Sequence, residues 1–170
     1  MSLRLVVQPQ HCIGCRSCEL ACAFTHGRDG MPGASRCQTL TVGKDEYVPV
    51  LCLQCDNAAC AQVCPVGAIT SDRGRGVLLV DHERCIRCMA CTVACPFGNI
   101  HFDPGMDSVS KCDLCTGYGN YPRCALFCPT KCLTVEQVEA PPEGEAEPPR
   151  VLRRPDYVTP ATMAGVSCAR

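Results

Sequence analysis

Four short runs of cysteine carry the chemistry that this sequence can perform. The run at 85–96, CIRCMACTVACP, has the spacing C-x2-C-x2-C-x3-C-P, and the other runs begin at Cys12, Cys52 and Cys112. Such spacing lets three thiolates wrap one [4Fe–4S] cluster, while the fourth cysteine reaches a second cluster. Together the runs use sixteen of the 19 cysteines. The sequence therefore predicts four [4Fe–4S] clusters as cofactors.

Each predicted cluster takes three thiolates from one run and the fourth from the run that pairs with it across a pseudo-twofold axis. The second and third runs are neighbours in sequence and are expected to pair, which leaves the first run to pair with the fourth. The predicted ligand sets are Cys12, Cys15, Cys18 and Cys128; Cys112, Cys115, Cys124 and Cys22; Cys52, Cys55, Cys60 and Cys95; and Cys85, Cys88, Cys91 and Cys64.

Structural zinc and disulfide bonds are two other uses of so much cysteine. Four thiolates also suit tetrahedral zinc, but zinc ribbons use two separated C-x2-C pairs and not a triple run closed by Cys-Pro. A secreted disulfide scaffold is disfavoured because the cysteine count is odd and MSLRLVVQPQ has no apolar signal-peptide core. Iron–sulfur ligation is the favoured interpretation, and a zinc-binding interaction module is the alternative. Cys37, Cys132 and Cys168 lie outside the runs and are expected to be spare thiols.

Other residue types indicate electron transfer and not catalysis. The sequence has no Ser/His/Asp set, P-loop or G-x-G-x-x-G motif, and complete ligand sets leave no iron open to a substrate. We therefore expect a non-catalytic protein with no catalytic residues. Positive charge near an anionic cluster should raise its reduction potential, although each such residue could equally be a solvated surface group. The basic residues that flank or interrupt the runs are His11, Arg16, Arg84, Arg87, Lys111 and Arg123. His26 and His101 are expected to donate hydrogen bonds or lie on the surface.

The runs must be positioned by short strands and helices. Strands are expected at 3–7, 37–42 and 46–52, after the second run, and on both sides of the third run; a helix is expected from 17 to 23. This helix is expected to continue through 23–27, because Ala23 replaces the proline that follows the last cysteine of the other runs. CPVGAI and CPFGNI are near copies, which indicates an internal repeat.

Two such repeats predict an α+β fold of two ferredoxin-like βαββαβ units. The segment 45–102 is expected to form one unit, inserted into another that is made of 1–44 and 103–138. This topology would place the four clusters in one row. The segment 139–150 is rich in Pro and Glu and is expected to be a linker. The tail 151–170 is expected to dock on a neighbouring subunit or to support self-association in a ring or filament.

Composition limits how the chain folds and what it binds. With 170 residues, no Trp, four Phe and four Tyr, it can build only a thin apolar core. Cluster assembly is therefore expected to supply much of the folding free energy, and the apoprotein is expected to be largely unfolded. A net charge of −1 gives no footprint for nucleic acid, and no apolar run reaches the ~18 residues of a membrane span. We expect a cytoplasmic protein or the soluble arm of a larger complex.

The motifs CIGCRSCELAC, CPVGAI, CPFGNI, KCDLC and CPTKCL, in this order, resemble the iron–sulfur subunits of the DMSO-reductase-type family over about 3–138. The resemblance implies a four-cluster, ferredoxin-like electron-transfer subunit. The short gap inside the fourth run is similar to the small members that serve formate dehydrogenase, formate hydrogenlyase, carbon monoxide dehydrogenase or tungsten aldehyde oxidoreductase.

The favoured partner is a tungsten- or molybdenum-pterin aldehyde or formate oxidoreductase, found in anaerobic metabolism, with a flavin/NAD subunit as the second redox partner. The alternatives are a diffusing polyferredoxin, or a partner of a hydrogenase or carbon monoxide dehydrogenase.

Overall fold

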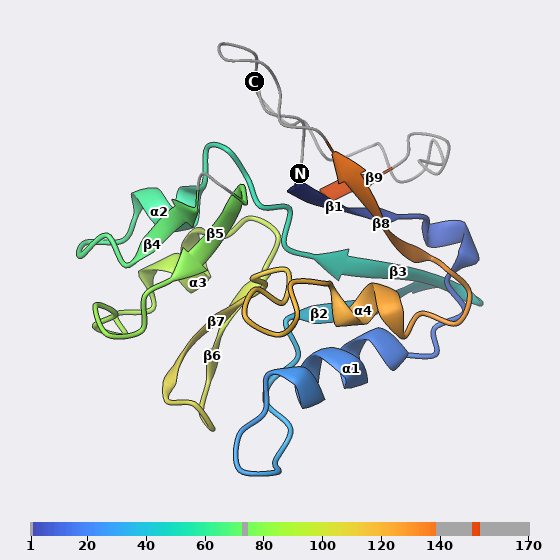
Figure 1. The fold of residues 1–170 in the computed structure, drawn as a ribbon, viewed down its shortest axis with the longest axis horizontal. Helices are drawn as coiled ribbons and strands as arrows, with labels where there is room; N and C mark the ends of the chain where they lie inside the picture. Colours follow the sequence, from blue (N-terminus) through green and yellow to red (C-terminus); the bar gives the residue numbers. More distant parts are fainter. Residues whose placement is uncertain (1, 73–74, 139–150, 154–170) are drawn as a thin grey trace.

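The computed structural model describes residues 2–72, 75–138 and 151–153, and the structural statements below concern these residues. They form a small, sheet-rich α/β protein with short helices (Figure 1). In chain order the elements are β1 (Ser2–Val7), the 3-10 helix η1 (Pro9–His11), α1 (Ser17–Thr25), β2 (Cys37–Gly43), β3 (Glu46–Leu51), α2 (Ala59–Gln62), β4 (Ile69–Asp72), β5 (Val77–Val80), α3 (Ala90–Ala94), β6 (Ile100–Asp103), β7 (Ser108–Lys111), α4 (Arg123–Leu126), β8 (Leu133–Val138) and β9 (Val151–Arg153).

The sheets join segments that are far apart in sequence. β1 lies between β8, to which it is antiparallel, and β9, to which it is parallel. Val7 lies opposite Leu133 in this sheet, so the chain enters the first cysteine run beside the point where it leaves the fourth. The remaining strands form three antiparallel hairpins, β2–β3, β4–β5 and β6–β7.

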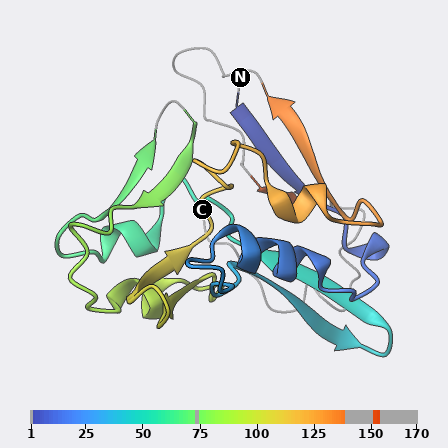
Figure 2. The same cartoon turned by 60° about the horizontal axis from the view of Figure 1, so that its bottom comes forward.

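The helices pack in two pairs. α1 packs against α4, and α2 packs against α3. Figure 2 shows the elements between α2 and β6 gathered on one side of the molecule, and α1, α4, β1 and β8 on the other. The first and fourth runs therefore lie together, as do the second and third. This is the arrangement expected of an inserted unit, although the assignment of two ferredoxin-like units stays a prediction.

Where the helix of each run ends depends on the residue that comes after the last cysteine of the run. α1 continues to Thr25, as predicted from Ala23, whereas α2, α3 and α4 are four or five residues long and end before a Cys-Pro pair. The strands expected at 3–7, 37–42 and 46–52 are confirmed. β7 was not predicted, because its sequence SVSK lacks the apolar alternation by which a strand is recognised.

The core is built from small apolar side chains and cysteine. One group contains Leu5, Leu51 and Leu133 with Cys18, Cys22 and other cysteines, and a second contains Ile69 and Ile100 with Cys91. Among the described residues no Phe or Tyr is buried.

No helix in the described part of the chain is both long and apolar enough to cross a membrane. Of the tail expected to dock, only Val151–Arg153 is described, as β9; the predicted linker, residues 154–170 and Cys168 lie outside the described residues.

Candidate metal centres

The four runs share one backbone feature. The residue just before the second cysteine of each run adopts the left-handed conformation, with φ of 69° at Gly14, 51° at Gln54, 59° at Arg87 and 53° at Leu114. L-residues adopt this conformation at a cost, and it is concentrated at functional sites. At Gly14 a side chain is also excluded sterically, because a Cβ atom would lie 2.6 Å from the Tyr47 ring. The runs therefore form four equivalent loops.

Two of the predicted ligand sets each line one cavity. Cys12, Cys15, Cys18 and Cys128 surround a cavity that is closed by residues such as Pro49 and Leu133. Cys64, Cys85, Cys88 and Cys91 surround another, which is closed by residues such as Ile69 and Val109. In both cavities the fourth cysteine comes from the run that was expected to pair.

Cysteines of the other two sets lie close enough to affect one another's pKa. Burial raises the pKa of Cys55, and repulsion from Cys52, Cys60 and Cys95 raises it further. Burial also raises the pKa of Cys124 well above its usual value, and Cys112, Cys115 and Cys22 add to the increase. Thiols crowded and desolvated in this way need a cation to become thiolates, which is the condition that a bound iron–sulfur cluster meets. The residues present fit the predicted cofactor.

Backbone amides are directed at several of these sulfur atoms. The N–H groups of Ala68, Arg36 and Arg123 donate to Sγ of Cys64, Cys22 and Cys115, at 3.2, 3.3 and 3.5 Å respectively. At Cys64 burial raises the pKa, but amide donors from the turn after Pro65 outweigh it and lower the pKa below its usual value. Such donors stabilise the anionic sulfur that a cluster ligand requires.

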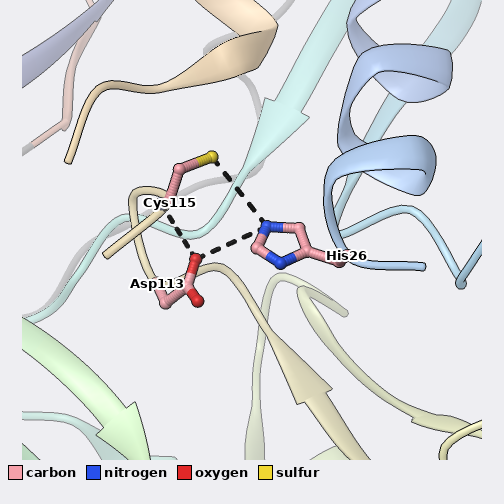
Figure 3. Close-up of side chains that lie close together, drawn as sticks. All are labelled: His26, Asp113 and Cys115. Carbon is pink, nitrogen blue, oxygen red and sulfur yellow. Dashed lines mark hydrogen bonds and ion pairs between the residues drawn. The ribbon is translucent and has the colours of Figure 1, made fainter. Parts of the chain in front are cut away.

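A buried polar group lies beside Cys115 (Figure 3). Nε2 of His26 lies 3.6 Å from Asp113 Oδ1 and 3.9 Å from Cys115 Sγ. Burial and the nearby Arg36 guanidinium lower the pKa of His26 to about 4, against the attraction of Asp113. The imidazole is therefore neutral at neutral pH. Because Cys115 belongs to a predicted ligand set, we interpret His26 as part of the hydrogen-bonding environment of that ligand, in agreement with the sequence analysis.

Arg36 and Asp113 form the most buried ion pair among the described residues. Arg36 Nη1 lies 2.8 Å from Asp113 Oδ2, and the two side chains are 7% and 18% exposed. Removing one partner of a buried pair leaves an uncompensated charge, so Arg36→Ala should lower the free energy of unfolding by about 3–5 kcal/mol. The measurement is anaerobic chemical denaturation of the cluster-loaded protein.

The control for that variant is Arg75→Ala. Arg75 is 51% exposed and lies 4.0 Å from its partner Asp72, so the change should be about 0–1 kcal/mol. Equal losses in the two variants would contradict the structural role of Arg36.

The structure separates the basic residues that the sequence grouped together. Lys111 is buried, Arg123 is partly buried, and His11, Arg16, Arg84 and Arg87 are exposed. Sequence reasoning missed Arg36, which approaches Cys22 and Asp113 only after folding, and Gln54, an ordinary residue within the second run whose contacts with Leu78, Lys111 and Cys112 arise only on folding. The left-handed position shared by the runs is a glycine only in the first of them, so it could not be recognised from residue type.

Cys37 and Cys132, expected to be spare thiols, are both buried beside predicted ligands. Cys37 is 4% exposed and hydrogen-bonds to Cys18 and Cys22, and Cys132 is 1% exposed and hydrogen-bonds to Cys12. Burial and repulsion from Cys12 and Cys128 raise the pKa of Cys132 to about 12, so it remains a thiol. Neither belongs to a predicted ligand set.

Comparison with known proteins finds iron–sulfur relatives along most of the chain. A 4Fe-4S dicluster domain matches residues 44–138, and a 4Fe-4S binding domain matches residues 9–25. The polyferredoxin-like subunit of an aliphatic sulfonate oxidoreductase from Pyrococcus furiosus is 36% identical over 73% of this chain and 70% of its own. Formate hydrogenlyase subunit 2 of Escherichia coli is 34% identical over 72% of this chain and 75% of its own. The electron transport protein HydN of the same organism is 34% identical over 78% of this chain and 87% of its own.

Proposed function

The chain belongs to the 4Fe-4S dicluster family of iron–sulfur electron-transfer proteins, and from this premise we propose that it holds four [4Fe–4S] clusters and passes electrons along them singly. Each bound cluster would take up and release one electron. The chain's own residues fix the ligands, exclude water and set the local charge. The observation that supports the proposal is that two predicted ligand sets each line one cavity, together with a cysteine of the run expected to pair. Mutual effects on the pKa values of cysteines in the other two sets agree with it.

Electrostatic effects between neighbouring ligand sets support a single row of clusters. A thiolate of one set acts electrostatically on a thiol of the next at three places: Cys60 on Cys91, Cys52 on Cys112, and Cys18 on Cys124. These electrostatic effects support the order third, second, fourth and first run. The pairing of the inner two sets connects the two proposed ferredoxin-like units.

The two ends of the row reach the surface. Cys15 and Cys88, the second cysteines of the first and third runs, are exposed. An electron can therefore enter at one end and leave at the other. Relatives are named an electron transport protein and a polyferredoxin-like subunit, so we propose that the reaction takes place on a partner.

The proposed partner is the catalytic subunit of an oxidoreductase complex. Relatives are subunits of formate hydrogenlyase and of an aliphatic sulfonate oxidoreductase, which supports residence in such a complex. We favour a tungsten- or molybdenum-pterin aldehyde or formate oxidoreductase, with a flavin/NAD subunit at the other end of the row. A freely diffusing polyferredoxin is the second candidate.

Anaerobic purification from the native source tests the proposal. We expect a brown protein with about sixteen iron and sixteen sulfide per chain, four of each for every cluster, and a catalytic subunit identified by mass spectrometry of the co-purifying proteins. Zinc in place of iron would overturn the proposal. A pure monomer with the full iron content would favour the diffusing carrier.

Two exposed isoleucines provide a test of the ends of the row. Ile13 and Ile86 occupy the same position in the first and third runs, and each is 60% exposed. Aspartate at either position should weaken partner docking and slow transfer at that end about tenfold, which corresponds to about 1.4 kcal/mol. The measurement is the rate of electron transfer with the co-purified partner at sub-saturating concentration.

The control is Val42→Asp, because Val42 is 53% exposed on the β2–β3 hairpin and lies outside the runs. All three variants should retain their iron. Unchanged rates in both isoleucine variants would place the entry and exit points elsewhere.

A further inference from the structure

A lysine side chain is buried where the two inner ligand sets meet. Lys111 ends β7 and precedes Cys112, and only 4% of it is exposed. Its ammonium group donates three hydrogen bonds, to Oε1 of Gln54 at 2.9 Å and to the carbonyl oxygens of Leu78 and Cys112 at 3.0 Å each. These contacts join the second run, β5 and the start of the fourth run.

Gln54 holds this ammonium group in place. It is 4% exposed and occupies the left-handed position before Cys55. Its Oε1 also accepts the N–H of Leu78 at 3.0 Å, and its Nε2 donates to the carbonyl of Cys112 at 2.7 Å. Both ends of the amide are therefore used, which fixes the lysine between the two units.

The charge of Lys111 has no counterion in the described protein. Its three acceptors are neutral, and the ion pairs of the described residues do not include it. A buried charge is expensive unless an opposite charge compensates it. The hydrogen bond to Gln54 holds the ammonium group beside the residue that precedes Cys55, and the hydrogen bond to the Cys112 carbonyl holds it at the first cysteine of the fourth run. The lysine therefore lies beside one run of each inner set.

We propose that the Lys111 ammonium is a fixed positive charge shared by the two inner clusters, and that it raises the reduction potentials of both. The inference rests on the proposed function. Thiolate-ligated clusters are anionic, so they supply the missing counter-charge. With the clusters bound, each transfer step would move one electron from a reduced cluster to its oxidised neighbour, so the oxidation of one would balance the reduction of the other. Reduction adds one negative charge, so a nearby cation stabilises the reduced form of either inner cluster.

The decisive variant is Lys111→Gln in the full chain with its clusters loaded. Glutamine keeps N–H donors for the buried carbonyls but removes the charge. Potentiometric titration followed by EPR should show two of the four midpoint potentials shifted to more negative values and the other two unchanged. Lys111→Arg, which keeps the charge, should restore both potentials towards the wild-type values. The control is Lys44→Gln in the exposed β2–β3 turn, which should shift none.

The result that would overturn the inference is a Lys111→Gln protein with full iron content and four unchanged potentials, or one in which all four shift equally. If this variant fails to load its clusters, Gln54→Glu provides the test, because a carboxylate at Oε1 neutralises the ammonium and should shift the same two potentials in the same direction. Unshifted potentials in loaded Gln54→Glu would overturn the inference. Failure of the proposed function looks different: the wild-type protein itself would lack four reducible clusters.

Discussion

Cys88→Ser is expected to lower the iron content from about sixteen to about twelve atoms per chain, since a [4Fe–4S] cluster needs all its thiolates. Cys88 lines the cavity that Cys64, Cys85 and Cys91 complete. The remaining three clusters should persist, because their ligands come from other groups of cysteines. With one end of the row lost, electron transfer from the partner should largely stop while the partner's own active site remains intact.

The matched control for this variant is Cys37→Ser. Cys37 is more buried than Cys88, touches two predicted ligands and yet belongs to no predicted set. It should keep about sixteen iron atoms, four for each of four clusters. Iron analysis and EPR of both variants, prepared anaerobically, provide the measurement. Loss of iron from Cys37→Ser, with none from Cys88→Ser, would contradict the assignment of ligands.

Removing the iron should unfold the protein. Binding of a structural metal contributes about 10–16 kcal/mol in small metal-dependent domains, which is as large as the whole stability of an ordinary domain, about 5–15 kcal/mol. Here the dependence should be strong, because nine of the buried apolar residues of the described chain are cysteines and none is aromatic. Without clusters the predicted ligand cysteines would surround cavities in place of a packed core.

This prediction is checked by circular dichroism and NMR after anaerobic chelation of iron. We expect loss of most β structure and collapse of amide dispersion, with recovery on reconstitution with iron and sulfide. Chelator added to a sample already saturated with iron is the control. A chelated protein that still unfolds cooperatively on heating would show that the side chains alone maintain the fold.

Loss of a cluster and unfolding of the chain are linked, because the second and third runs lie between the first and fourth runs in the sequence. Each proposed cluster joins a cysteine early in a unit to one late in it, as Cys22 joins the group of Cys112, Cys115 and Cys124. A cluster therefore closes a long loop of chain, and its loss releases a correspondingly large conformational entropy. Unfolding of one unit is expected to affect the other, because Lys111 and Gln54 connect them through buried hydrogen bonds.

The cysteine spacing was sufficient to predict 4Fe-4S binding and several elements that hold the runs, while the number of clusters and the pairing of their ligands stay predictions. Ligand chemistry is local, since a thiolate loop such as Cys12 to Cys18 is defined by steps of three residues. The effect of a proline or of Ala23 on the length of the helix in its own run is local too. β1 and the β2–β3 hairpin were predictable for the same reason. These features depend on residues that are neighbours in the chain.

Charge placement and burial became known only from the folded chain. In the sequence Lys111 is one of six basic residues near cysteines, and Gln54 is an ordinary residue within a run. Folding buries both and joins them by a hydrogen bond although they lie 57 residues apart in the chain, while Arg84 and Arg87 remain in solvent. The electrostatic effect of a residue depends on its distances and on the water around it, and these are properties of the packed molecule and not of residue order.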